Sequence, residues 1–494
     1  MTPAAVLFDL YGTLVDAGDS SLLSRLPSAL GVSRAAWMSL LRGGLLTTAF
    51  RDEDAFVATL ARTLAPARPD AEEICRGLVR AELDPVRLVP GVVSLLNFLK
   101  RRGLKLGLVS NLASPFKAPV GRFGLEGFFD AFALSCDEGI AKPDPAIYER
   151  ALSRLGVDAG ATLFVGDSLQ NDVRAPAALG MKTAGIGTRE GEADVTVFSA
   201  AHLGLLDLTL PGFLPLLSPG DRVAVAGREA IVLELNPVAD GEQGRYNLVY
   251  RIEAHAAGAG ASPLRLYVKR FLLPETAHLE AFAYRLQALT GLPSCSAALH
   301  PGTEPLLLLT EAPGAKFSGP PTLEVARALG AHFVFAFLFS NADMQPRNAF
   351  VSGGTVTLVD LEHCFFNVAL DTEGLEHPER PETFDRMPKD ELERRVRKKL
   401  QSHRAMSRVR RAFFADTPRG SPVDDAFHEG FIEFYEAQRA RADALSHILL
   451  ERVHAEPPLI VGTRGHRRAM AEVDVEGIRK RLAMEPEAAF EAAW

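Results

Sequence analysis

The stretch Ala4-Ala5-Val6-Leu7-Phe8-Asp9-Leu10-Tyr11-Gly12-Thr13-Leu14-Val15-Asp16 decides the fold of the first part of the chain. Its four apolar residues Ala5–Phe8 predict a short buried strand that delivers Asp9 at its carboxyl end. Gly12 then lets the backbone turn away sharply. Because ligands of open α/β sheets bind at the carboxyl ends of the strands, a carboxylate at this position can act as a nucleophile or as a metal ligand. Asp9 is therefore the first candidate catalytic residue.

Composition limits what the chain can be. With 494 residues it has room for two or three domains, and 47% hydrophobic and 23% charged residues are ordinary for a globular protein. The formal net charge of −8 gives no support to nucleic-acid binding by the whole chain. The four cysteines are widely separated, which indicates neither a zinc site nor a disulfide framework. Without a signal-peptide pattern or an apolar run that could span a membrane, we expect a cytoplasmic protein with no membrane partner.

The pattern of apolar residues divides the chain into three parts. Residues 1–211 alternate strand-like and helical patterns, which predicts a parallel sheet, and the helical pattern of about residues 17–90 predicts an inserted cap. The stretch 210–220, dense in proline and glycine, is the expected boundary. Residues 221–455 predict a small β-rich lobe followed by a larger helical lobe, and residues 456–494 a loosely attached helical tail. The strands expected in the first part are residues 5–8, 105–110, 131–135, 162–165 and 183–186.

A basic run without acidic residues occupies residues 394–411. A solvated helix face accounts for such a run, and a site for phosphate-bearing or nucleic-acid partners is the sharper alternative. The second alternative predicts a steep dependence of binding on salt.

Further polar residues in the first part follow expected strands. Ser110 ends one strand, and its hydroxyl can hold an anionic oxygen. Lys142 is fixed between a turn and a helix, where its charge can offset the negative charge of the substrate and of Asp9. Asp167 and Asp172 follow another strand and bring two more carboxylates toward Asp9. Mg²⁺ prefers carboxylate and phosphate oxygens, and together with a lysine it can clamp a phosphoryl oxygen while a carboxylate attacks in line.

In their order along the chain these segments resemble the motifs of the haloacid dehalogenase (HAD) superfamily, over about residues 4–210. The helical insertion resembles the superfamily's first type of cap. The resemblance implies a Rossmann-like core, a phospho-aspartyl or alkyl-aspartyl intermediate on Asp9, and Mg²⁺ in the phosphatase branch, with a small phosphate ester as substrate. It implies Asp9, Ser110 and Lys142 as catalytic residues. The implied metal ligands are Asp9, Asp167, Asp172 and the backbone carbonyl of Tyr11.

Tyr11 departs from the superfamily's first motif, Asp-x-Asp-Gly-Thr-Leu, which has an aspartate at this position. In HAD phosphatases that aspartate protonates the leaving alcohol and then activates water, so its loss costs about 10²–10⁴-fold if nothing replaces it. The dehalogenase branch carries tyrosine here, but it resembles Ser-Ser-Asn at the fourth motif, where this chain has Gly166-Asp167-Ser168. We expect a Mg²⁺-dependent phosphatase. A 2-haloacid dehalogenase and a catalytically weak relic stay open as alternatives.

A second group of polar residues lies beyond residue 221. An alternating strand ends in Lys269, and Glu280 on the following helix is placed to pair with it. Asp343, Asn348 and Asp360 come later, the last of them after a short apolar strand. This order is the arrangement of kinase catalytic loops, in which the first aspartate accepts the hydroxyl proton while the asparagine and the second aspartate hold Mg²⁺ against the phosphates of ATP.

Residues 221–450, approximately, resemble the protein-kinase-like phosphotransferase superfamily. The Asp-x-Glu ending at Glu362 looks like aminoglycoside phosphotransferases, whereas Asn341-Ala342-Asp343 looks more like the HipA-type and phosphatidylinositol-kinase-like branches. The resemblance implies ATP and Mg²⁺ as cofactors and leaves the acceptor open. The expected nucleotide loop has two glycines, not Gly-x-Gly-x-x-Gly. The residues implied in nucleotide binding are Lys269, Glu280, Gly241, Gly244, Asn348 and Asp360, with Asp343 as the catalytic base.

The two resemblances together predict a bifunctional phosphoryl-transfer protein. Its fold would be an α/β Rossmann-like HAD core with an inserted helical cap, followed by an α+β bilobal kinase-like domain. A regulatory or sensor protein in which one domain has lost turnover is the alternative, motivated by Tyr11 and by the sparse glycine loop. Binding of Mg-ATP or of phosphate esters without turnover would favour the sensor.

Overall fold

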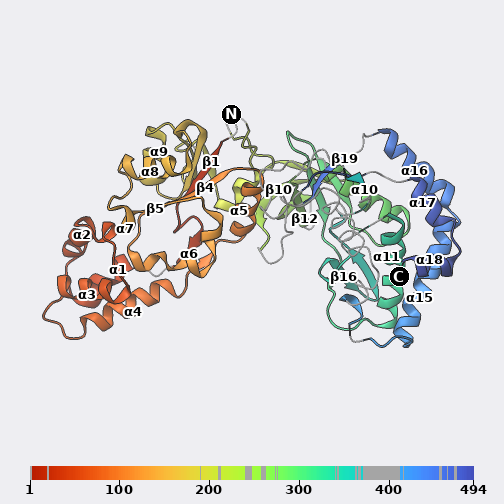
Figure 1. Ribbon diagram of the computed structural model, residues 1–494, viewed down its shortest axis with the longest axis horizontal. Coiled ribbons are helices and arrows are strands. Elements are labelled where there is room, and N and C mark those ends of the chain that lie inside the picture. Colours follow the sequence, from red (N-terminus) through yellow and green to blue (C-terminus); the bar gives the residue numbers. More distant parts are fainter. Residues whose placement is uncertain are drawn as a thin grey trace, which may run out of the picture. The chain divides into compact units, whose positions relative to one another are not determined.

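The computed structural model describes the chain as two compact units (Figure 1). One unit comprises Met1–Ser218 with Asn236–Tyr250, and the other Pro219–Leu235 with Arg251–Trp494. The segment Asn236–Tyr250 thus groups with the first unit although it lies beyond the expected boundary. The described residues are 3–18, 22–189, 191–209, 213–239, 247–256, 263–272, 274, 276–339, 341, 344–361, 364, 369–370, 412–415, 417–455, 459–463, 466–471 and 475–493.

A six-stranded parallel sheet forms the core of the first unit (Figure 1). Its inner strands are nearly continuous apolar runs because their residues are buried on both faces, as is typical of parallel sheets. In the central strand β1 (Ala5–Phe8) every residue is fully buried. The expected Rossmann-like core with a parallel sheet is confirmed. The order across the sheet is β5 (Ala131–Leu134), β4 (Lys105–Ser110), β1, β6 (Thr162–Gly166), β7 (Lys182–Ile186) and β8 (Val195–Val197).

A helical insertion separates β1 from β4. The chain leaves the core through β2 (Val15–Asp16) and returns through β3 (Arg87–Leu88), and these two short strands pair with each other antiparallel. The insertion has the helical character that its apolar period predicts, and it buries Trp37 and Phe56. Its helices are α1 (Leu22–Leu30), α2 (Arg34–Arg42), α3 (Glu53–Leu64) and α4 (Ala71–Leu83).

The remaining helices of the first unit connect the strands, and their ends follow from local sequence. In α8 (Pro145–Leu155) the side chain of Asp144 accepts a hydrogen bond from the Ala146 N–H, Pro145 occupies the first turn, and Gly156 ends the helix in a left-handed conformation. An aspartate N-cap, a proline in the first turn and a left-handed glycine after the last turn are all common at helix ends. The others are α5 (Val92–Arg101), α6 (Ala118–Arg122), α7 (Ser135–Glu138) and α9 (Ala175–Ala178).

A six-stranded sheet, most of which belongs to the second unit, contains the antiparallel pairs β9–β10, β12–β14 and β13–β14. A three-stranded sheet and a helical part follow. No helix within the described ranges is both long and apolar enough to cross a membrane. The strands of the large sheet are β13 (Ala297–His300), β14 (Leu306–Thr310), β12 (Pro263–Arg270), β11 (Leu248–Ala256), β10 (Arg228–Pro237) and β9 (Arg222–Val225); the small sheet contains β15 (Ala315–Lys316), β16 (Ala349–Ser352) and β17 (Thr355–Leu358).

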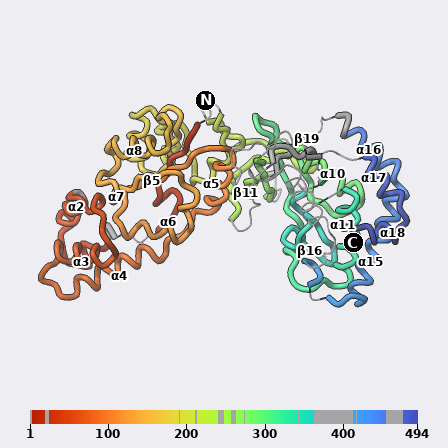
Figure 2. The backbone as a smooth tube through the Cα atoms, viewed as in Figure 1, coloured from red at the N-terminus to blue at the C-terminus, as the bar shows by residue number. Residues whose placement is uncertain are grey.

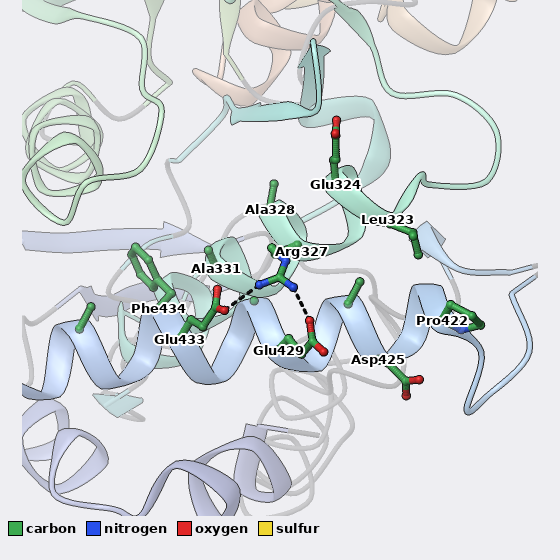
Figure 3. Close-up of a pocket in the computed structure, with 13 residues that line it drawn as sticks. Leu323, Glu324, Arg327, Ala328, Ala331, Pro422, Asp425, Glu429, Glu433 and Phe434 are labelled. Atoms are coloured by element: carbon green, nitrogen blue, oxygen red, sulfur yellow. Dashed lines mark hydrogen bonds and ion pairs between the residues drawn. The ribbon is translucent and has the colours of Figure 1, made fainter.

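The helices α11 (Leu323–Phe339) and α15 (Pro422–Arg439) form the closest helix pair of the second unit. A Cβ on Gly330 would lie 2.2 Å from the Phe427 carbonyl oxygen, and one on Gly430 would lie 2.0 Å from the Arg327 carbonyl oxygen, so only glycine permits this approach. A groove of about 840 Å³ runs along the pair (Figure 3). Arg327 crosses it and pairs with Glu429 and Glu433.

The C-terminal segment differs from the loosely attached helical tail that its sequence suggested. β19 (Leu459–Thr463) and β20 (His466–Ala471) pair with each other, and β20 pairs with β18 (Ala369–Leu370). The helices α17 (Val475–Leu482) and α18 (Pro486–Ala493) bury apolar residues in the core of the second unit, among them Ile478, Leu482 and Ala489. Figure 2 traces α17 and α18 along α15 and α16 (Ala442–Ala455). The alanine-rich composition hid the spacing of Ile478 and Leu482, which suits a buried helix face.

Candidate active site

Three strand ends meet around Asp9. Asp9 follows β1 and is 7% exposed, and its backbone N–H donates to the Val165 carbonyl of β6 at 2.9 Å. Ser110 is the buried last residue of β4, and Asp167 directly follows β6. β1 lies between β4 and β6 in the sheet, so the carboxyl ends of these three parallel strands lie side by side at one edge. From this point the strand order continues through β4 to β5 in one direction and through β6 to β7 in the other. Such a switch point is the usual ligand site of an open α/β sheet.

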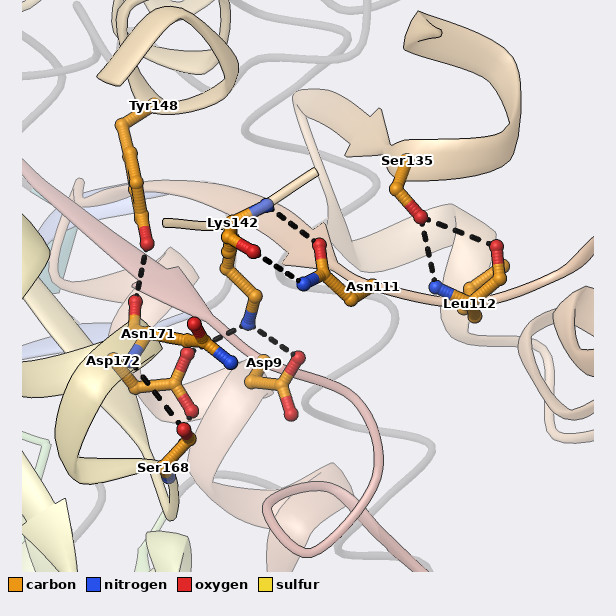
Figure 4. Close-up of polar contacts among 9 residues, drawn as sticks. All are labelled: Asp9, Asn111, Leu112, Ser135, Lys142, Tyr148, Ser168, Asn171 and Asp172. Carbon is orange, nitrogen blue, oxygen red and sulfur yellow. Dashed lines mark hydrogen bonds and ion pairs between the residues drawn. The ribbon is translucent and has the colours of Figure 1, made fainter. Parts of the chain in front are cut away.

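Lys142 joins two of the carboxylates (Figure 4). Its Nζ lies 2.8 Å from Asp9 Oδ1 and 2.6 Å from Asp172 Oδ1, and its side chain is 2% exposed. A cation held between two anions at these distances makes strong charge-assisted hydrogen bonds. The structure therefore brings Asp9, Lys142 and Asp172 into one buried network.

Asn111 holds Lys142 in place, a role that sequence reasoning missed. Its side-chain oxygen accepts the Lys142 backbone N–H at 2.7 Å, and its amide nitrogen donates to the Lys142 carbonyl at 2.8 Å (Figure 4). Asn111 follows Ser110, so the end of β4 is bound to the lysine loop by its next residue. The position directly after Ser110 was the only signal in the sequence.

Asp172 is held from the side of β6. Its Oδ2 accepts the backbone N–H of Ser168 at 2.9 Å, and the hydroxyl of Ser168 accepts the backbone N–H of Asn171 at the start of the helical turn Leu169–Arg174 (Figure 4). Gly166 leaves the room that this carboxylate occupies, because a Cβ there would lie 2.4 Å from Asp172 Oδ2. The close approach explains why glycine ends β6.

Asp9, Asp167 and Asp172 form the acidic cluster of the site. Each can offer one oxygen such that the three oxygens lie within 4.8 Å of one another. Gly12 also borders the cluster: its φ is +71°, and a Cβ there would lie 2.3 Å from Asp167 Oδ2. A set of hard oxygen donors at this spacing suits Mg²⁺. Among the described residues, this donor set therefore fits the metal that the sequence implies.

The pKa values in the cluster respond to burial and to neighbouring charge. Burial lowers the pKa of Lys142, but the charges of Asp9 and Asp172 outweigh it and raise that pKa overall. Burial raises the pKa of Asp172 to about 6; Lys142 opposes this rise and the charge of Asp9 adds to it. Burial and the charge of Asp9 also raise the pKa of Asp167. One lysine thus leaves three carboxylates incompletely neutralised, and a divalent cation would relieve their repulsion.

The side chain of Tyr11 is not placed to transfer a proton to a substrate. Its hydroxyl donates to the backbone carbonyl of Phe116 at 3.1 Å, and its ring meets the ring of Phe116 edge-on with centroids 6.4 Å apart. Burial raises the pKa of the Tyr11 hydroxyl well above its usual value. The side chain is therefore a neutral, bound phenol at physiological pH.

In the second unit, Lys269 lies at the centre of another buried network. Its Nζ is 2.8 Å from Glu280 Oε2 on α10 (Thr276–Leu289) and 2.6 Å from Asp360 Oδ1. The backbone N–H of Leu361 donates to Glu280 Oε1 at 3.2 Å, and that of Asp360 donates to the Tyr284 hydroxyl at 2.9 Å. Asp360 has a φ of +62°, a left-handed conformation that is costly without glycine. The surrounding bonds fix it there.

The other residues expected in this part of the chain are placed only in part. Asn348 is buried and directly precedes β16, which forms a hairpin with β17 just before Asp360. Asp343, Gly241, Gly244, Glu362 and the basic run 394–411 lie outside the described residues.

Comparison with known proteins identifies the first unit. Residues 3–180 match the family described as haloacid dehalogenase-like hydrolase. A phosphoglycolate phosphatase of Yersinia pestis is 32% identical over 212 residues, which cover 39% of this chain and 84% of the relative. The chain belongs to the haloacid dehalogenase-like hydrolase family. The family match ends at residue 180 and does not extend into the second unit.

Other relatives of this haloacid dehalogenase-like chain match over different lengths. A glyceraldehyde 3-phosphate phosphatase of Pyrococcus abyssi is 36% identical over 100 residues, so the match spans 20% of this chain and less than half, 42%, of that relative. A crystal structure of a HAD phosphatase from Thermococcus onnurineus is 25% identical and covers 40% of this chain and 95% of that one, with a TM-score of 0.31.

Proposed function

We propose that the first unit is a Mg²⁺-dependent phosphohydrolase that forms a phospho-aspartyl intermediate on Asp9. The observation that carries the proposal is the buried contact of Asp9 with Lys142 beside two further carboxylates. Asp9, Asp167, Asp172 and the backbone carbonyl of Tyr11 would hold the metal, which would supply positive charge to the phosphoryl oxygens. Small phosphate esters are the proposed substrate class, in keeping with the phosphatase names of the relatives.

Each remaining side chain has a part in this reaction. Asp9 would attack the phosphorus through the oxygen that Lys142 does not hold, because only Oδ1 of Asp9 contacts that lysine. Lys142 would stay charged throughout, since its pKa is raised, and would orient both carboxylates. Ser110, buried at the adjacent strand end, would donate its hydroxyl to a phosphoryl oxygen. Such preorganised donors and charges are usually the largest contribution to catalysis.

Phosphate release from a panel of small phosphate esters, with and without Mg²⁺, tests this proposal on the full chain. Asp9→Asn is expected to abolish Mg²⁺-dependent release. Asp158→Asn is the matched control, because Asp158 is an exposed aspartate of the same unit whose side chain caps no helix. Release that survives Asp9→Asn would refute the assignment. Binding of Mn²⁺, followed by its spectroscopic signal, is expected to weaken in Asp172→Asn and would report on the metal site independently of turnover.

For the second unit we infer an ATP-dependent phosphotransferase, which would make the chain bifunctional. The specific observation in its favour is the contact of Lys269 with both Glu280 and Asp360. In this proposal Lys269 would hold the α- and β-phosphates of ATP, Asn348 and Asp360 would hold Mg²⁺, and Asp343 would accept the proton of the acceptor hydroxyl. The proposed domain limits are 1–211 for the phosphohydrolase and 221–455 for the phosphotransferase, with 456–494 as a C-terminal segment whose helices pack on the latter.

Calorimetric titration of the full chain with Mg-ATP tests this second proposal. Lys269→Met is expected to abolish binding, whereas Lys480→Met should leave it intact because Lys480 is an exposed residue of α17 whose ion pair with Glu476 spans 3.8 Å. Equal binding by the two variants would refute the nucleotide assignment. Binding by the parent chain without ATP turnover in the presence of candidate acceptors would instead favour a sensor.

A further inference from the structure

We propose that the first unit is specialised for acyl phosphates, whose leaving group departs as a weakly basic carboxylate and needs no proton from the protein. This inference rests on the proposed phosphohydrolase function of Asp9 and changes its preferred substrate from phosphate esters to acyl phosphates, which are mixed anhydrides. It follows from what surrounds Asp9: the Tyr11 hydroxyl donates to a backbone carbonyl, and the carboxylates of Asp167 and Asp172 serve the acidic cluster.

The first such group is Tyr11, which belongs to a column of aromatic rings that joins the core to the cap. Its ring meets Phe116 with centroids 6.4 Å apart, and Phe116 meets Phe56 of the cap helix α3 at 6.2 Å. The column continues to Phe50 at 5.2 Å from Phe56, and the backbone N–H of Phe50 donates to Ser114 Oγ at 2.9 Å. The Tyr11 side chain thus packs in the interface between cap and core, and its proton is directed to a backbone carbonyl.

The groups on the other side of Asp9 are committed to one another. Lys142 divides its charge between two carboxylates. Asp172 accepts from Lys142 and from the Ser168 N–H, so neither of its oxygens is free of a donor. Asp167 shares the acidic cluster with Asp9 and is a proposed metal ligand. A carboxylate that binds a metal cannot at the same time deliver a proton to a departing oxygen.

Among the described residues, Glu82 of the cap helix α4 is an acid close enough to Tyr11 to raise the pKa of its hydroxyl. Its half-buried carboxylate is thus the alternative proton donor that an experiment has to exclude. Arg122, the other charged group that acts on Tyr11, donates to the backbone carbonyls of Leu83 and Val86 at 2.9 Å each. Arg122 is a permanent cation and transfers no proton.

The bond changes show why the leaving group matters. In the first half-reaction the bond from Asp9 Oδ to phosphorus forms, and the bond from phosphorus to the bridging oxygen breaks with its electron pair passing to that oxygen. An acyl phosphate then releases a carboxylate, whose conjugate acid has a pKa of about 4. An alkyl phosphate would release an alkoxide, a far stronger base that has to be protonated as it leaves. Absence of that proton transfer costs about 10²–10⁴-fold.

The second half-reaction is slow for the same reason. The oxygen of a water molecule forms a bond to phosphorus, the bond to Asp9 breaks with its electron pair returning to the carboxylate, and the water proton passes to an oxygen of the departing phosphate. Without a side-chain base to take that proton, the phosphorylated form of Asp9 is expected to accumulate during turnover.

The test compares the full chain on acetyl phosphate and on glycerol phosphate with Tyr11→Asp. Because acetyl phosphate is intrinsically more reactive, the informative quantity is the differential response to the substitution. Tyr11→Asp should raise kcat/KM for glycerol phosphate at least about 10²-fold more than for acetyl phosphate. Acid-quenched parent protein should carry phosphate on Asp9 during turnover of acetyl phosphate, and Tyr11→Asp should carry less.

Three results would overturn the inference, and none depends on the folding of Tyr11→Asp. The first is that Tyr11→Phe lowers glycerol phosphate turnover at least tenfold more than acetyl phosphate turnover, which would make the Tyr11 hydroxyl the acid. The second is the same selective loss in Glu82→Gln. The third is turnover of pyrophosphate by the parent chain without turnover of acetyl phosphate. If no substrate phosphorylates the parent protein and Asp9→Asn changes nothing, it is the proposed function that fails.

Discussion

Replacing Lys142 by methionine should destabilise the first unit strongly, because the methionine keeps the volume of the lysine stem and removes its charge. The side chains of Asp9 and Asp172 that Lys142 neutralises are only 10% and 0% exposed. Removing one partner of a buried ion pair leaves an uncompensated buried charge and costs about 3–5 kcal/mol. We therefore expect Lys142→Met to lower the free energy of unfolding by about that amount at neutral pH.

The fluorescence of Trp37 offers a direct readout. Trp37 and Trp494 are the two tryptophans of the chain, and Trp37 is buried in the cap of the first unit. In a Trp494→Phe background, urea unfolding followed by fluorescence reports on this unit. Lys182→Met is the matched control: Lys182 pairs with Asp194 at 2.7 Å, but with side chains 46% and 27% exposed. An exposed pair of this kind contributes about 0–1 kcal/mol.

Two outcomes would refute the reasoning. One is a loss for Lys142→Met no larger than the loss for Lys182→Met, which would mean that burial does not set the cost. The other concerns the orphaned charge itself: adding Asp172→Asn to Lys142→Met removes one of the two unpaired carboxylates and should restore part of the lost stability. A double variant no more stable than Lys142→Met would show that the charge is not the cause.

Further predictions concern glycines and one histidine. Gly12→Ala should lower the free energy of unfolding by about 1–2 kcal/mol, because alanine is strained at this positive φ. It should also lower phosphate release, because the added Cβ would lie 2.3 Å from Asp167 Oδ2. Gly31 has a similar φ of +69° but open space around it, so Gly31→Ala should affect urea unfolding alone. Gly430→Ala should cost about 1–3 kcal/mol of unfolding free energy in the second unit by pushing α15 away from α11. Burial lowers the pKa of His332 from 6.5 to about 4, so the unfolded state binds the proton more tightly. The stability that neutral His332 contributes is therefore complete above about pH 6.5. Between about pH 6.5 and pH 4 the free energy of unfolding should fall by up to about 1.4 kcal/mol for each pH unit. His332→Gln should flatten this pH dependence, as measured by urea unfolding.

Local sequence was sufficient to predict five of the six strands of the first unit's sheet, all but β8, and to place several candidate residues at the strand ends. Ala5–Phe8 and Lys105–Ser110 are strands with the expected bounds, because uninterrupted apolar runs bounded by polar residues leave little choice of element. The parallel order then follows from the alternation with helices, and it brings Asp9, Asp167 and Asp172 to one edge. Chemistry-bearing residues at strand ends can therefore be recognised from local sequence alone.

Contacts between distant segments were not predictable in this way. Nothing local to Tyr11 indicates that its hydroxyl is bound by Phe116, 105 residues away. The hydrogen bonds between Asn111 and Lys142 could not be predicted from local sequence either. Nor could the close approach of α11 to α15 at Gly330 and Gly430. Each depends on tertiary packing, whereas composition and period describe a residue only through its neighbours in sequence.

The pairing of β2 with β3 has a consequence for protein engineering. Val15 and Leu88 are register partners, so the point where the cap begins and the point where it ends are adjacent across a ladder. A loop whose ends are already held together can be shortened or exchanged with little entropic cost. The cap should therefore be replaceable as a unit. A short turn that joins Asp16 to Arg87 should yield a core without the cap that keeps its sheet. Caps of other shapes, inserted at the same junction, should change which molecules reach the carboxyl ends of the strands.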